Sequence, residues 1–158
     1  MNRALLPAGM MLFAMIGLTP IYAQAPTPEG NRIVLVKLNQ PPCKSLSSDD
    51  IITARIAYRI AEAEQSADGF AVSIKFQGTD PRMTFSVTRG RTSTPTPDGT
   101  AVTLRSDTLT LTYPMAAIMQ DARLRRPITC YFYLHRNMGK GRSIVIARTP
   151  PIVFRECL

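Results

Sequence analysis

The residues that could do acid–base or nucleophilic chemistry are few in this chain. His135 is the only histidine, so any catalytic arrangement of serine or cysteine with histidine has to use it. It lies in a run of alternating β-branched and aromatic residues, with no recognisable nucleophile motif beside it. The sequence therefore favours a non-catalytic protein, and an exported hydrolase that uses His135 is the alternative.

Motifs for metals and cofactors are also missing from the sequence. It contains no Cys-x-x-Cys, no paired histidines at ligand spacing and no acidic calcium loop. The segment from Gly139 to Ser143 matches a phosphate-binding loop only in part, because the first glycine of that motif is absent and no helix is expected after it. We therefore predict no metal site and no cofactor.

Three cysteines allow three pairings and leave one residue over. Alternation along 128–135 places Cys130 with Ile128, Phe132 and Leu134, so we expect it to be a small buried residue rather than a reactive thiol. Cys43 follows the first expected strand and Cys157 ends the last. If the terminal strands run side by side, these two can form a disulfide in an oxidising compartment. A bridge from Cys130 to Cys157 and an intermolecular bridge stay open.

Positive charge is concentrated at the C-terminal end. The formal net charge is +8. Residues 24–121 hold ten Lys/Arg and ten Asp/Glu, whereas residues 122–158 hold eight Lys/Arg and one Asp/Glu. Such a region attracts anions, and aromatic side chains on one strand face would add stacking surface. The candidate binding residues are Arg123, Arg125, Arg126, Tyr131, Tyr133, His135, Arg136, Lys140, Arg142 and Arg148.

The partner that this composition suggests is an anionic envelope component or an acidic protein. Nucleic acid is not expected as a partner, because an exported protein is separated from the nucleic acid inside the cell. The competing interpretation is structural: hairpin ends are solvated, and arginines protect sheet edges from unwanted pairing.

The first 23 residues predict export. Arg3 and the apolar run from Leu5 to Leu18 are typical of a secretory signal peptide, and cleavage after Ala23 is favoured. The run is too short to span a bilayer. We expect residues 1–23 to be the signal peptide, 24–31 a flexible lead-in and 32–158 one domain. The mature chain would have no transmembrane segment and would be a soluble periplasmic or secreted protein.

Short strands separated by turn residues dominate the rest of the chain. A β-hairpin over 127–149 is the clearest element, since two β-branched and aromatic runs flank a glycine-containing loop. Pro114 begins a segment, 114–124, that predicts one or two turns of helix. The other expected strands cover 32–38, 70–76, 83–88, 101–104, 109–113 and 152–157.

The segment 49–65 is ambiguous. Ser47 and Ser48 as possible N-caps and the run of Ala and Glu favour helix. Alternation of apolar residues from Ile52 to Ile60 and the turn residues that follow favour strand, which is our prediction.

These patterns predict an all-β fold: a single antiparallel β-sandwich, immunoglobulin-like in general architecture, with about seven to nine short strands and one short helix. A barrel is the lesser alternative, and an α+β fold with a helix at 49–65 is another. The function that we expect is that of an exported, non-catalytic binding or accessory protein of the cell envelope. A structural subunit that offers a sheet edge to an envelope assembly is a further alternative.

Overall fold

The computed structural model describes residues 30–40, 44–86 and 99–155, and nearly all regular structure in it is strand. One helix of four residues, α1 (Ala116–Met119), lies within the segment for which a short helix was predicted. The strands are β1 (Arg32–Leu38), β2 (Ile51–Arg59), β3 (Phe70–Gln77), β4 (Thr84–Phe85), β5 (Thr100–Val102), β6 (Ser106–Pro114), β7 (Ile128–Asn137), β8 (Ser143–Arg148) and β9 (Ile152–Phe154).

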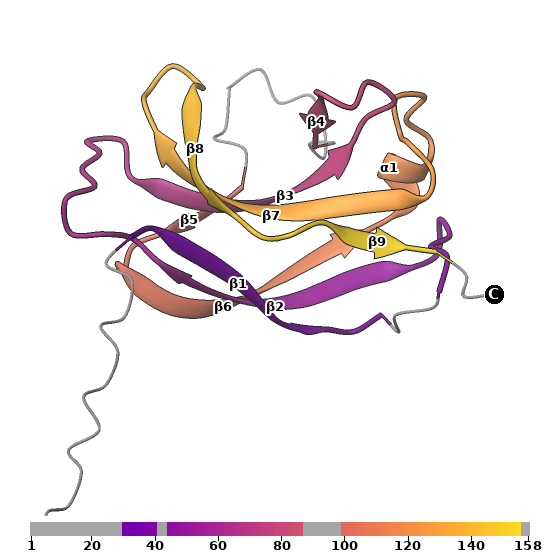
Figure 1. The fold of residues 1–158 in the computed structure, drawn as a ribbon, viewed down its shortest axis with the longest axis horizontal. Coiled ribbons are helices and arrows are strands. Elements are labelled where there is room, and N and C mark those ends of the chain that lie inside the picture. Colours follow the sequence, from indigo (N-terminus) through magenta and orange to yellow (C-terminus); the bar gives the residue numbers. More distant parts are fainter. Residues whose placement is uncertain (1–29, 41–43, 87–98, 156–158) are drawn as a thin grey trace, which may run out of the picture.

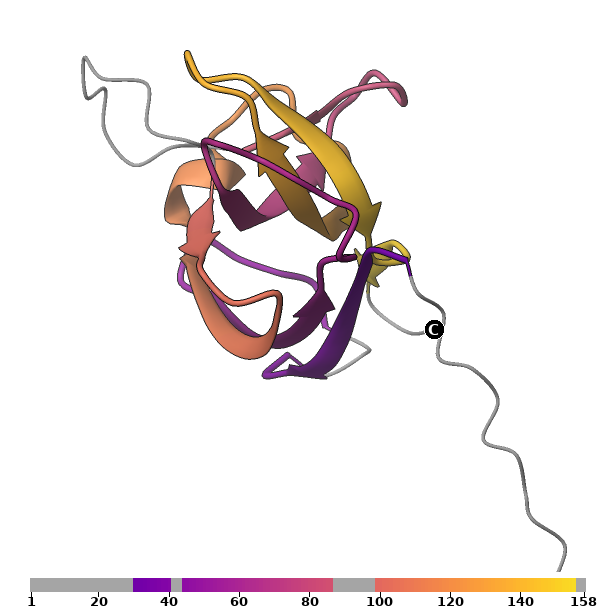
Figure 2. The same cartoon turned by 90° about the vertical axis from the view of Figure 1, so that its left-hand side faces the viewer.

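The strands form two antiparallel sheets that lie one above the other (Figure 1). The small sheet has the order β1-β2-β6. The large sheet has the order β4-β3-β7-β8, with β5 also pairing with β3 and β9 with β7. Figure 2 shows β1 and β6 as the two borders of the small sheet, with β2 between them. The predicted all-β, antiparallel class is therefore confirmed, while the closer likeness to an immunoglobulin domain stays a prediction.

Apolar residues of β2, β3 and β7 fill the space between the sheets. From Ile52 of β2 to Ile60, directly after its end, every second residue is buried, as expected for a strand that shows one face to the core. The phenyl rings of Phe76 and Phe132 are fully buried opposite this face. The alternative of a helix at 49–65 is wrong, because the period of two in the apolar residues places them on one face only in a strand.

Two element boundaries differ from the sequence prediction. An interruption was expected around Ser106 and Asp107, yet β6 begins at Ser106 and pairs with β2 without a register shift over its whole length. The break lies at 103–105 instead. β4 is only two residues long, and residues 87 and 88 of the strand expected over 83–88 lie outside the described part of the chain, as does almost all of the loop expected over 91–100.

The predicted hairpin is confirmed as β7 and β8, but β8 covers only half of β7. β8 pairs with Tyr133 to Asn137, and β9 takes the other half, from Ile128 to Cys130. As a result Arg148, at the end of β8, stands opposite Tyr133 in the middle of β7. A second strand that paired with the whole of β7 would have placed it near the start of β7.

Candidate functional site

β7 carries its side chains on two faces, as the sequence predicted. Cys130, Phe132 and Leu134 are fully buried against the small sheet. Tyr131, Tyr133 and His135 share the opposite face: the ring centroids of the two tyrosines are 6.0 Å apart, and those of Tyr133 and His135 are 5.8 Å apart. Tyr133 and His135 are nevertheless buried, so this row is not the exposed stacking surface that was expected.

A serine of the neighbouring strand binds the histidine. Oγ of Ser73 lies 2.6 Å from Nε2 of His135, and the two residues are 5% and 3% exposed. In the register of the sheet Ser73 stands opposite Tyr133 and Ala71 stands opposite His135, so the hydrogen bond runs diagonally across the two strands.

Other polar side chains on this face are also hydrogen-bonded. The hydroxyl of Tyr131 donates to Oε1 of Gln77 over 3.1 Å, and Nζ of Lys75 donates to Oγ of Ser86 over 3.0 Å. The hydroxyl of Tyr133 lies 3.3 Å from Oγ1 of Thr84. We call this set the outer polar cluster. Its members are Ser73, Lys75, Gln77, Thr84, Ser86, Tyr131, Tyr133 and His135.

The outer polar cluster contains the first two members of a nucleophile arrangement. A histidine that accepts the proton of a serine hydroxyl can turn the oxygen into an attacking group. Within the described residues, no three His, Cys, Asp or Glu side chains gather in a group that could hold a metal ion. The cluster itself offers hydroxyl, imidazole, amide and ammonium groups.

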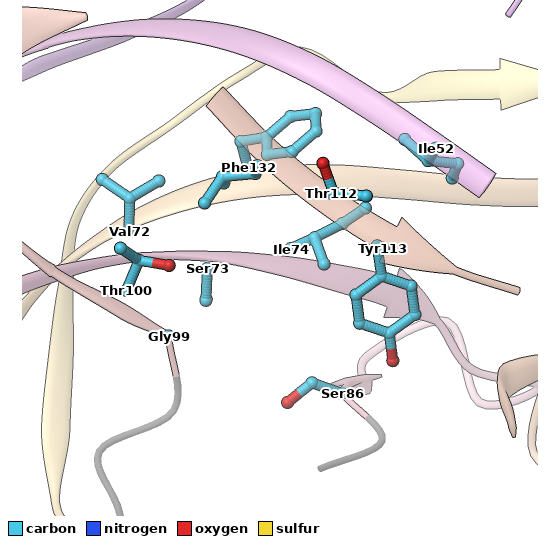
Figure 3. Close-up of a pocket in the computed structure, with 11 residues that line it drawn as sticks. Ile52, Val72, Ser73, Ile74, Ser86, Gly99, Thr100, Thr112, Tyr113 and Phe132 are labelled. Atoms are coloured by element: carbon cyan, nitrogen blue, oxygen red, sulfur yellow. The ribbon is translucent and has the colours of Figure 1, made fainter. Parts of the chain in front are cut away.

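A cavity of about 160 Å³ opens beside Ser73, at the border between the sheets. β3 pairs with β5 through residues 70–72 and with β4 through 76–77, so no described strand covers residues 73–75 on that side. Figure 3 shows Val72 and Ile74 turned toward the interior and Ser73 turned away from it. Leu111, Thr112 and Tyr113 of β6 form the facing wall. The serine, but not the histidine, lines this cavity.

Two of the predicted binding arginines are paired with acids. Arg123 forms an ion pair of 2.6 Å with Asp121, and its guanidinium lies 4.5 Å from the centre of the Phe85 ring. Hydrogen bonds from Arg123 lower the pKa of Asp121 to about 2. Arg136 forms an ion pair of 2.7 Å with Glu64. These two cations are partly neutralised within the protein itself.

The remaining predicted cations are exposed but do not lie in one row. Lys140 and Arg142 belong to the β7–β8 turn, which packs on the β2–β3 connection through a bond of 2.6 Å from Oγ of Ser66 to the carbonyl of Asn137. Arg126 lines a different cavity, together with Arg155. These remaining exposed cations are Arg125, Arg126, Lys140, Arg142 and Arg148.

A second group of cations lies on the outer face of the small sheet, where the sequence had not suggested one. Arg32 of β1 stands directly opposite Arg59 of β2, and Lys37 stands directly opposite Arg55. Lys37 and Arg55 also line a common groove with Thr110 of β6. We call these four residues the small-sheet cations.

Acids are nearly absent from the strands of the small sheet. Asp107 is the one acid in β1, β2 and β6, and its register partner is the buried Tyr58. It therefore belongs to the other face of the sheet. Alternation did place Arg55 and Arg59 on one face of β2, but only the pairing of β1 with β2 shows that each meets a second cation.

The cysteines are partly outside the described residues. Cys130 is free and buried, as its place in the alternating pattern predicted, and burial raises the pKa of its thiol to about 12. Cys43 and Cys157 lie outside the described residues, so their bridge stays a prediction.

No family model, curated protein or solved structure matches this chain. Within the described part of the chain, no helix is long and apolar enough to cross a bilayer.

Proposed function

We propose that this chain is an exported, non-catalytic binding protein of the cell envelope and that it recognises an anionic partner. The observation that carries the proposal is the like-charged register pair of Lys37 in β1 and Arg55 in β2. Like charges directly opposite each other destabilise a sheet. An anion bound across the two strands would remove this repulsion, so the arrangement favours a bound anionic group.

The groups around Lys37 and Arg55 suit such a ligand. Both side chains are exposed, and among the described residues neither forms an ion pair. Threonine hydroxyls and an asparagine line the same groove and can donate further hydrogen bonds; these residues are Asn39, Thr53 and Thr110. The distribution of charge along the sequence suggests another candidate surface for the anion, formed by exposed cations of the hairpin region such as Lys140 and Arg142.

Binding to two probes tests the proposal: vesicles of phosphatidylcholine with and without phosphatidylglycerol, and immobilised dextran sulfate. The double variant Lys37→Gln/Arg55→Gln removes two charges from the small sheet. The double variant Lys140→Gln/Arg142→Gln removes two from the hairpin turn and is the matched control for net charge. We expect the first to weaken binding about tenfold or more, since each cation near an anionic surface contributes about 1 kcal/mol.

The two variants separate the possible surfaces. Loss of binding only in the Lys140→Gln/Arg142→Gln variant would move the site to the hairpin. Absence of binding by the unmodified protein at low salt, or binding that added salt leaves unchanged, would overturn the proposal as a whole.

A second candidate function rests on Ser73 and His135. A hydroxyl 2.6 Å from an imidazole nitrogen at the wall of a cavity favours an exported hydrolase. Oγ of Ser73 would attack an acyl carbon, His135 would take its proton and pass it to the leaving group, and water would then cleave the acyl-serine. A fluorophosphonate tests this second function. Labelling of the unmodified protein that is lost in Ser73→Ala and kept in Ser143→Ala, a variant at an exposed position, would support it. No labelling of the folded protein would exclude it.

A further inference from the structure

β6 is a border of the small sheet that no strand of the described residues covers, and its middle, between Asp107 and Pro114, lacks the usual protection of such borders. Its register with β2 runs from Ser106 to Pro114 without a bulge. β1 and β8, which border the other side of the molecule, each have a register shift. No charged residue occurs in β6 after Asp107. Bulges and charges are means by which natural sheets prevent pairing with another chain, so β6 is better suited to accept a strand than β1 or β8.

Hydrogen bonds at its two ends show which β6 amides point outward. The carbonyl of Arg105 accepts from Ile60, and the amide of Met115 donates to Asp50, so odd-numbered residues face β2. N–H and C=O groups alternate sides along a strand, so the even-numbered residues direct theirs to the open border. The amide of Thr108 already donates a hydrogen bond of 2.7 Å to Oδ1 of Asp107. Among the described residues, no group accepts a hydrogen bond from the amide of Thr110 or Thr112.

The sequence of β6 is complementary to itself. The segment from Thr108 to Thr112 reads Thr-Leu-Thr-Leu-Thr in both directions. If two copies pair antiparallel about Thr110, threonine meets threonine on the outer face and leucine meets leucine on the inner face. Cross-strand pairs of these kinds are favourable, and a two-fold contact requires that one patch match itself.

We infer that β6 pairs with β6 of a second copy of this chain and joins the two small sheets into one six-stranded sheet. The outward amides of Thr110 and Thr112 would form about four main-chain hydrogen bonds with the other copy. Leu111 and Tyr113, which line the cavity beside Ser73, would lie at the contact. The inference does not depend on anion binding.

The size of the contact sets the expected affinity. A strand of nine residues is about 30 Å long, and two packed sheets are together about 20 Å thick. If the contact extends over this length and this thickness, each copy buries about 600 Å². The total lies at the lower end of specific interfaces, for which we expect dissociation in the micromolar range. β1 would not serve as well, because self-pairing there would bring together cations such as Arg32 and Lys37.

Sedimentation of the full chain over micromolar to millimolar concentrations tests the inference. We expect a monomer–dimer equilibrium that shifts at least tenfold toward monomer in Thr110→Lys, where two charges would meet on the two-fold axis. Thr53→Lys places the same charge on the neighbouring strand and should leave the equilibrium within about twofold. A monomer at all concentrations, or equal effects of the two variants, would overturn the inference.

A disulfide reports the register. In Thr110→Cys the two Cα atoms across the axis would be about 5.5 Å apart, within the range of a disulfide, and oxidation should give a covalent dimer. Thr53→Cys should give no more dimer than the unmodified chain. Equal cross-linking of both variants would show that chance encounters, and not β6 pairing, produce the bridge. Higher salt should strengthen this dimer by screening the net positive charge, whereas it should weaken anion binding.

Discussion

Ser73 and His135 join the two central strands of the large sheet through a hydrogen bond of 2.6 Å. Both side chains are buried although they lie on the face that turns away from the small sheet. The bond is therefore part of the structure of the outer polar cluster, whatever its role in function.

Removal of the serine hydroxyl should destabilise the protein. Ser73→Ala takes away the partner of a buried ring nitrogen, which costs about 1–3 kcal/mol. Urea unfolding measures this change in the free energy of unfolding. Ser143→Ala, at an exposed position of β8, should stay within about 0.5 kcal/mol. Equal stability of the two variants would contradict a structural role for the bond.

Gly99 is required where β5 begins. Its φ is +130°, and a Cβ there would lie 2.6 Å from the carbonyl oxygen of Val72. Gly99→Ala should therefore lower the free energy of unfolding by about 1–3 kcal/mol through backbone strain and the displacement of β5 from β3. Gly30→Ala is the control, because nothing lies within 4 Å of its added Cβ. Two equally stable variants would contradict the close approach of Gly99 to β3.

Cys130 should make the protein sensitive to alkali. Burial raises the pKa of its thiol from 9.0 to about 12, so in this interval the unfolded chain loses a proton that the folded chain retains. The free energy of unfolding should therefore fall as pH rises above about 9, and the fall should be smaller in Cys130→Ala. Iodoacetamide should alkylate Cys130 in the folded protein far more slowly than in urea. Equal rates would show that the thiol is accessible.

The predicted bridge between Cys43 and Cys157 can be tested by peptide mass mapping without reduction. Ser45 and Arg155, each two residues from one of the cysteines, line the same cavity of about 300 Å³. We expect the two cysteine-containing peptides to be linked and Cys130 to be a free thiol. Reduction should lower the free energy of unfolding by at most about 4–5 kcal/mol. A bridge that includes Cys130 would refute the pairing.

Local patterns in the sequence determined the strands and their faces. Alternation from Ile52 to Ile60 is enough to make β2 a strand with one buried face, and the same rule assigned Cys130 and His135 to opposite faces of β7. These inferences hold because the period of two is a property of the strand itself, independent of its neighbours.

Only the tertiary structure decided which side chains meet. Ser73 and His135 are 62 positions apart, and Lys37 meets Arg55 only because of a register shift between β1 and β2. Register depends on turns, bulges and packing between sheets, none of which composition or periodicity specifies. The sequence therefore determined an all-β chain with excess positive charge near its end, whereas pairing between distant strands decided where cations oppose one another and which border stays open.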